Sequence, residues 1–195
     1  MGWPATERFE LVVAPGGLAL IQDLLNTRSA RRPPSPDLLS TVAQAQAWAD
    51  EALEAWALAA GQARRRARLT RADVEQLRTL RDQLVVAVRA PGAPVPDALL
   101  GLSVRSARGA DGALLLEPVG RGWELVAGAV LLELHRAREL DTWRRVKTCR
   151  NEACPGTFYD RSPNNSGAWH DVRSCGNVAN LRAARARRRM RATSS

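Results

Sequence analysis

The sequence predicts a mainly helical α+β protein: a helical N-terminal domain with one small β-hairpin, then a small zinc module and a basic C-terminal helix. Several long segments carry apolar residues at helical spacing, and one short region alternates apolar and polar residues on either side of an Asp-Gly pair. All three cysteines fall within 27 residues near the C-terminus. With 195 residues, 45% of them hydrophobic, the chain can form one ordinary domain and a small appendage.

Four helices are expected in the N-terminal part, at residues 18–28, 37–66, 70–89 and 123–140. The first follows Gly16-Gly17 and is stopped by the prolines that begin at Pro33, because proline lacks the amide donor. The second is rich in Ala, Leu, Gln and Glu, with Gly61 as a candidate end. The third opens with Thr70 and Asp73 at the spacing of a capping box.

A two-stranded hairpin is expected between the last two of these helices. Residues 102–106 alternate apolar and polar side chains, and residues 114–119 form a second apolar run. Asp111-Gly112 lies between them and supplies the positive-φ turn that a hairpin needs.

The charge is concentrated at the C-terminal end. Residues 1–142 hold 17 basic and 17 acidic residues, whereas residues 143–195 hold 12 basic and three acidic residues. The formal net charge of +9 therefore lies on the last 53 residues. A neutral body with a basic end favours contact with a polyanion, and we expect a domain boundary near residue 142.

The sequence also excludes some classes of protein. No apolar run approaches the roughly 20 residues of a membrane-spanning helix, and the first residues, MGWPATERFE, lack the pattern of a signal peptide. We therefore expect a cytoplasmic, nucleoid-associated protein. Neither the HExxH pattern nor the HxE…PCxxC deaminase pattern occurs, so we expect a protein that is not an enzyme.

The cysteines and one of the two histidines have the spacing Cys149-x4-Cys154-x15-His170-x4-Cys175. Two close ligand pairs suit a tetrahedral ion, and the turn-rich segment between them has little apolar material for a core of its own. We predict one structural Zn²⁺ on Cys149, Cys154, His170 and Cys175. The alternatives are three unrelated thiols with a surface histidine, a disulfide, which an odd cysteine count disfavours, and a catalytic zinc, which would keep an open coordination position.

These residues resemble the CGNR zinc finger family. Members typically show two cysteines five apart, an F-x-D-x-S segment, a Trp-Cys pair and a Cys-Gly-Asn-Arg signature; the corresponding residues here are Cys149 and Cys154, Phe158 to Ser162, Trp169-His170 and Cys175-Gly176-Asn177. Residues 1–142 resemble the ABATE domain that commonly precedes this finger, with Asp23-Leu24-Leu25-Asn26-Thr27 at its L-D-x-x-N-T motif. The resemblance implies a stress-induced transcription regulator with a treble-clef-like zinc module over residues 143–195.

The chain departs from the family pattern at two positions. His170 stands where the family usually has its third cysteine, and imidazole is still a good zinc ligand, so we expect a Cys3His site. Val178 replaces the signature arginine after Asn177, so any contribution of that arginine in relatives is lost here.

The segment after Asn177 is rich in alanine and arginine, which favours a C-terminal helix. Its arginines spread over several faces of such a helix, which suits contacts to backbone phosphates better than base reading. We expect double-stranded DNA to be bound by Arg182, Arg185, Arg187, Arg188, Arg189 and Arg191. The alternative is a solvated basic tail that only keeps the protein soluble.

The leading functional hypothesis is a bacterial-type transcription regulator, in which the N-terminal domain senses a small molecule or a partner and the zinc module binds DNA. A second hypothesis is an adaptor whose finger docks a protein such as RNA polymerase. A homodimer is compatible with either. A zinc enzyme, and redox sensing through loss of zinc from oxidised thiolates, are further alternatives.

Overall fold

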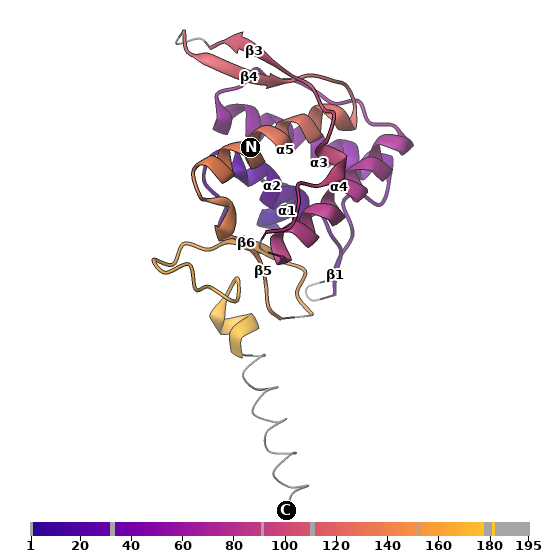
Figure 1. The fold of residues 1–195 in the computed structure, drawn as a ribbon. Helices are drawn as coiled ribbons and strands as arrows, with labels where there is room; N and C mark the ends of the chain where they lie inside the picture. Colours follow the sequence, from indigo (N-terminus) through magenta and orange to yellow (C-terminus); the bar gives the residue numbers. More distant parts are fainter. Residues whose placement is uncertain are drawn as a thin grey trace, which may run out of the picture.

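In the computed structural model, five α-helices surround a single core, and a small β-hairpin module follows them (Figure 1). The structure describes residues 2–31, 34–90, 92–109, 112–151, 153–177 and 181. Within these residues the helices are α1 (Pro4–Glu7), α2 (Leu18–Leu25), α3 (Val42–Ala60), α4 (Arg71–Arg89) and α5 (Trp123–Glu139). The strands form three antiparallel pairs: β1 (Ala30–Arg31) with β2 (Pro34–Ser35), β3 (Val104–Arg108) with β4 (Leu114–Pro118), and β5 (Val146–Thr148) with β6 (Thr157–Tyr159).

The helices of the N-terminal part start and stop at residues with identifiable capping chemistry. Thr70 and Asp73 form the predicted capping box at the start of α4. The helix expected at residues 37–66 is shorter than predicted, because the Thr41 side chain caps it at one end and Gly61, at φ +65°, ends it at the other. The first predicted helix also ends early, at Leu25, with Asn26 as its C-terminal cap.

Helix α2 lies at the centre of the core. All eight of its residues are buried, and it contacts α1, α3, α4, α5 and β6. Helices of this kind, apolar on most faces, are stable only when other elements surround them. Trp48 and Trp56 of α3 anchor the core as large buried side chains, and their indole N–H groups donate to the carboxylates of Asp23 and Glu133.

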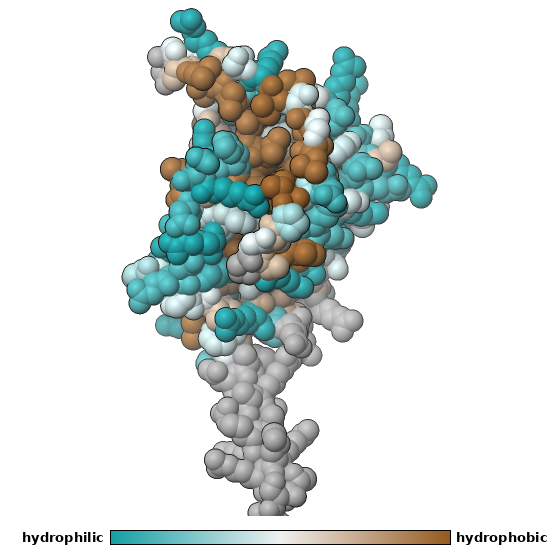
Figure 2. All heavy atoms as spheres, viewed as in Figure 1, coloured by the Kyte–Doolittle hydropathy of each residue, from teal (hydrophilic) through white to brown (hydrophobic). Residues whose placement is uncertain are grey.

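The predicted hairpin is confirmed as β3–β4, which packs on α5 through β4. Gly112 of the turn has φ +83°, as the Asp-Gly pattern requires, whereas Asp111 lies outside the described residues. Apolar side chains gather over this region (Figure 2), and Val104, Leu114 and Leu116 are exposed on its strands. None of the described helices is long and apolar enough to cross a membrane.

Candidate metal centre and nucleic-acid interface

The zinc module begins as a tight turn between β5 and β6. Cys149 follows β5, and its backbone N–H donates to the carbonyl of Gly156 at 2.9 Å, while the Cys154 N–H donates to the carbonyl of Asn151 at 2.7 Å. A Cβ at position 156 would lie 3.2 Å from the Cys154 Sγ, so only glycine leaves the thiol room without adjustment. The turn therefore holds both sulfur atoms on one side of the hairpin.

His170 and Cys175 come from the following segment and meet the first pair of cysteines. Cys175 lies in a short π-helical turn, η3 (Val172–Gly176), whose first residues are capped by the side chain of Asp171. One ligand atom from each of Cys149, Cys154, His170 and Cys175 lies within 4.8 Å of every other. The structure thus brings together all four residues that the sequence singled out as metal ligands.

The cluster fits a tetrahedral zinc ion. With Zn–S near 2.3 Å and Zn–N near 2.05 Å, a sulfur and a nitrogen on one tetrahedral ion lie about 3.5 Å apart. The Cys154 Sγ and the His170 Nδ1 are 3.5 Å apart. The Asn151 Nδ2 donates to the Cys175 Sγ at 3.3 Å, and the Gly156 N–H donates to the Cys154 Sγ at 3.4 Å, as expected beside thiolates. The four residues form a potential zinc-binding site.

The protonation of the three thiols supports the same conclusion. A hydrogen bond from Cys154 lowers the pKa of Cys149 to about 3, and the same contact raises the pKa of Cys154. Burial raises the pKa of Cys175. Three thiols so close together cannot all ionise without a cation among them, and a divalent metal ion would supply that charge.

Comparison with known protein families bears directly on this module. Residues 145–188 match the CGNR zinc finger family. The matched segment contains all four candidate ligands and the hairpin β5–β6. No curated protein matches the chain.

A buried carboxylate, Asp160, organises the long loop of the zinc module. Asp160 accepts hydrogen bonds from the backbone N–H groups of Ser162 and Gly167, at 2.9 and 2.6 Å, and from the Lys147 Nζ at 2.6 Å. Burial opposes ionisation of Asp160, but these hydrogen bonds outweigh it and hold its pKa below the usual range. A Cβ at Gly167 would lie 2.8 Å from this carboxylate, so the motif needs glycine there.

The zinc module, called the finger below, is joined to the helical domain through buried polar side chains of the α2 region. The Asn26 Nδ2 donates to the carbonyl of Thr157 at 2.9 Å, and the Thr157 N–H donates to the Asn26 Oδ1 at 2.8 Å. The Gln22 Nε2 donates to the same carbonyl at 3.3 Å. These contacts fix β6, and with it the zinc hairpin, against α2 across the predicted boundary at residue 142.

The arginines predicted to bind nucleic acid, and Val178, lie outside the described residues: Arg182, Arg185, Arg187, Arg188, Arg189 and Arg191. Two further arginines of the finger, which the sequence did not single out, are exposed beside the ligands. Arg150 follows Cys149, and Arg173 precedes Cys175 by two residues. Neither side chain makes a hydrogen bond or ion pair within the part of the chain that the structure describes. Their adjacency to cysteines in an acid-poor segment is the signal that could have found them.

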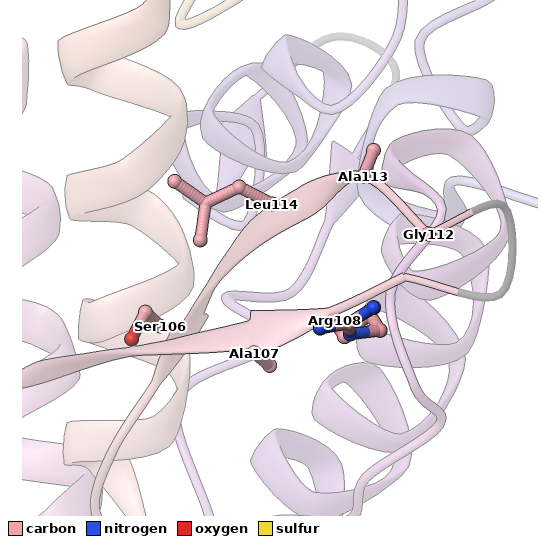
Figure 3. Close-up of a pocket in the computed structure, with 6 residues that line it drawn as sticks. All are labelled: Ser106, Ala107, Arg108, Gly112, Ala113 and Leu114. Atoms are coloured by element: carbon pink, nitrogen blue, oxygen red, sulfur yellow. The ribbon is translucent and has the colours of Figure 1, made fainter.

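A hollow lies elsewhere, at the tip of the hairpin β3–β4. It measures about 430 Å³, and Figure 3 shows its lining: Ser106, Ala107, Arg108, Gly112, Ala113 and Leu114. These described lining residues include no acid, histidine or cysteine. This hollow therefore offers no metal-ligating side chain among its described lining residues.

Proposed function

We propose that this protein is a zinc-finger transcription regulator that binds double-stranded DNA through residues 143–195, with residues 1–142 as a regulatory domain. The observation that carries the proposal is the pair Arg150 and Arg173, exposed beside the candidate zinc ligands without a side-chain partner among the described residues, and followed in sequence by the arginine-rich segment. Guanidinium groups without carboxylate partners are free to replace the counterions of a phosphate backbone.

The basic side chains of the finger divide into two groups, and this division supports the proposal. Arg145 and Lys147 are used inside the module, where Arg145 donates to the carbonyls of Asp160 and Ser162 and Lys147 binds the Asp160 carboxylate. Arg150 and Arg173 are not used in this way. Charge that is not needed for folding can serve binding without a cost to the fold.

The regulatory role of the N-terminal domain rests on how the finger is held. Its β6 strand is bonded to Asn26, and β5 contacts α4, so the finger is seated on the helices that form the core. A shift in the position of Asn26, at the C-terminal end of α2, would therefore move β6 of the finger. The resemblance of residues 1–142 to the ABATE domain points to the same role.

The DNA-binding proposal is tested by measuring the affinity of the zinc-loaded full chain for duplex DNA over a range of salt concentrations, by fluorescence anisotropy. If about five phosphates are engaged, log affinity falls with log salt at a slope near −4.5. Arg150→Gln and Arg173→Gln should each make the slope less steep by about one. Arg66→Gln, an exposed arginine of the helical domain, is the matched control and should leave the slope unchanged.

The alternative function is an adaptor that docks RNA polymerase or another acidic protein through the finger, because acidic protein surfaces also attract arginine. A slope near zero against duplex DNA, together with saturable capture of purified polymerase that Arg150→Gln weakens, would replace the DNA-binding proposal with the adaptor. A random-library DNA selection with the zinc-loaded protein would show whether binding depends on base sequence. Catalysis has no part in either proposal.

A further inference from the structure

A second pocket lies in the helical domain, between the segment that follows α2 and the middle of α4. Its volume is about 370 Å³, within the size range of small-molecule sites. The described lining residues are Arg28, Ser29, Asp37, Arg81, Asp82 and Val85. The backbone at its rim is fixed, because the Arg8 guanidinium donates to the carbonyls of Asn26, Arg28 and Pro36.

Arg28 is the unusual member of this lining. Its guanidinium makes no hydrogen bond or ion pair with the described residues, and its Nη1 is buried without a partner. Burial and the nearby charges of Arg89 and Arg81 lower the pKa of Arg28. A half-buried guanidinium held beside two others is unfavourable unless something negative accompanies it.

The carboxylates of the pocket bond Arg81 and not Arg28, although their charges partly offset those of the guanidinium groups. The Arg81 Nη1 donates to both carboxylate oxygens of Asp37, at 2.8 and 2.9 Å, and the Arg81 Nε donates to Asp82 at 3.2 Å. The charged groups that act on Arg28 are Arg81, Arg89, Asp37 and Asp82. Among the described residues near the pocket, the guanidinium groups outnumber the carboxylates of Asp37 and Asp82, so the local charge is positive.

We propose that this pocket binds a small organic carboxylate, with the carboxylate on Arg28 and the apolar part of the molecule against Val85. A planar guanidinium matches the two oxygens of a carboxylate, and the buried Arg28 Nη1 lacks a hydrogen-bond partner among the described residues. A phosphate group, with about −1.5 to −2 charges near neutral pH, would bring more negative charge close to the carboxylates of Asp37 and Asp82, which repel it. Ser29, exposed at the rim, offers a hydroxyl to a polar substituent of the ligand.

Ligand binding in this pocket would give the N-terminal domain a way to regulate the finger. Arg28 is two residues from Asn26, which holds Thr157 of the finger, and Arg8 bonds the carbonyls of both. Carboxylate binding itself does not depend on DNA binding, so it can be measured whether or not the finger binds DNA. Only the coupling between pocket and finger rests on the proposed function.

The test is an NMR titration of the zinc-loaded full chain with sodium benzoate and sodium acetate, at constant ionic strength against sodium chloride. The backbone amide signals of Ser29 and Val85 should shift and saturate. Arg28→Gln should weaken the affinity by about tenfold or more, since a hydrogen bond to a charged group is lost. Arg66→Gln should bind as the unmodified chain does, which controls for general attraction to a basic protein.

Three results would overturn the proposal: shifts confined to the basic C-terminal module, equal affinities for the unmodified chain and Arg28→Gln, or tighter binding of inorganic phosphate than of carboxylates at the same amides. Because the Arg28 side chain makes no hydrogen bond or ion pair with the described residues, Arg28→Gln should fold, which its melting temperature checks. If it does not fold, the amide shifts of the unmodified protein still decide the location and the chemistry of the site.

Discussion

The side-chain amide of Asn26 pairs with the backbone of Thr157 in both directions, with N···O distances of 2.9 and 2.8 Å. Both residues are fully buried, and they are 131 positions apart in the chain. An asparagine amide carries a donor and an acceptor in the geometry of a peptide group, so it can take the place of a neighbouring strand. Through this pair, the helical domain supplies β6 with a partner that the finger lacks.

Replacing Asn26 with alanine should destabilise the protein. The Thr157 N–H would lose its acceptor in a buried position, and an unsatisfied buried group costs about 1–3 kcal/mol. Chemical denaturation of the zinc-loaded chain measures this loss. Asn164→Ala, at an exposed site of the finger loop, is the control and should change the free energy of unfolding by less than about 0.5 kcal/mol. Equal effects of the two substitutions would show that the Asn26–Thr157 pair contributes nothing.

Asp23 should titrate near pH 6, because burial raises its pKa to about 6 although it accepts hydrogen bonds from the Thr6 N–H at 2.7 Å and the Trp48 indole N–H at 2.8 Å. The folded pKa lies above the unfolded value of about 4, so the folded state holds this proton more tightly. The stabilisation from this proton is complete below pH 4 and is lost as the pH rises through 6. The free energy of unfolding should fall by about 3 kcal/mol over this range.

The indole N–H signal of Trp48, which donates to the Asp23 carboxylate, reports this titration in NMR spectra. A midpoint near pH 6 is expected for the unmodified chain, and Asp23→Asn should abolish it. A midpoint below pH 4 would show that the hydrogen bonds outweigh burial.

Asp73 should stabilise the protein more than an ordinary helix-capping residue does. It accepts from the Thr70 N–H at 2.7 Å in the capping box of α4, and from the Trp123 N–H at 3.0 Å at the start of α5. Asp73→Ala removes both, and we expect a loss of about 2–3 kcal/mol in the free energy of unfolding. The control is Glu75→Ala, which removes only an exposed ion pair with Arg71 and should cost about 0.5 kcal/mol or less. If the two variants have the same melting temperature, the hydrogen bond from the Trp123 N–H to Asp73 does not stabilise the protein.

The elements that the sequence predicted well are those with local signals. The capping box at Thr70, the end of α3 at Gly61 and the hairpin β3–β4 each depend on residues that are neighbours in sequence. The spacing of the three cysteines and His170 likewise identified the zinc cluster, because short ligand pairs already fix much of its geometry.

The features that the sequence did not predict depend on distant partners. The pattern from Asp23 to Thr27 could be recognised as a motif, but its roles are set by Thr6, Trp48, Arg81 and Thr157, which only the fold brings together. That Arg28, Arg150 and Arg173 have no side-chain hydrogen bond or ion pair within the described residues was equally inaccessible from the sequence. A sequence shows that an arginine is present, but not whether a carboxylate lies beside it.

The zinc assignment is tested most directly by native mass spectrometry of the full chain and of His170→Ala. Three thiolates and one imidazole close a tetrahedron, so the unmodified chain should carry one zinc ion, and His170→Ala should lose it at a lower concentration of chelator. Zinc-free protein in which the hairpin β5–β6 keeps its native amide protection would contradict the assignment.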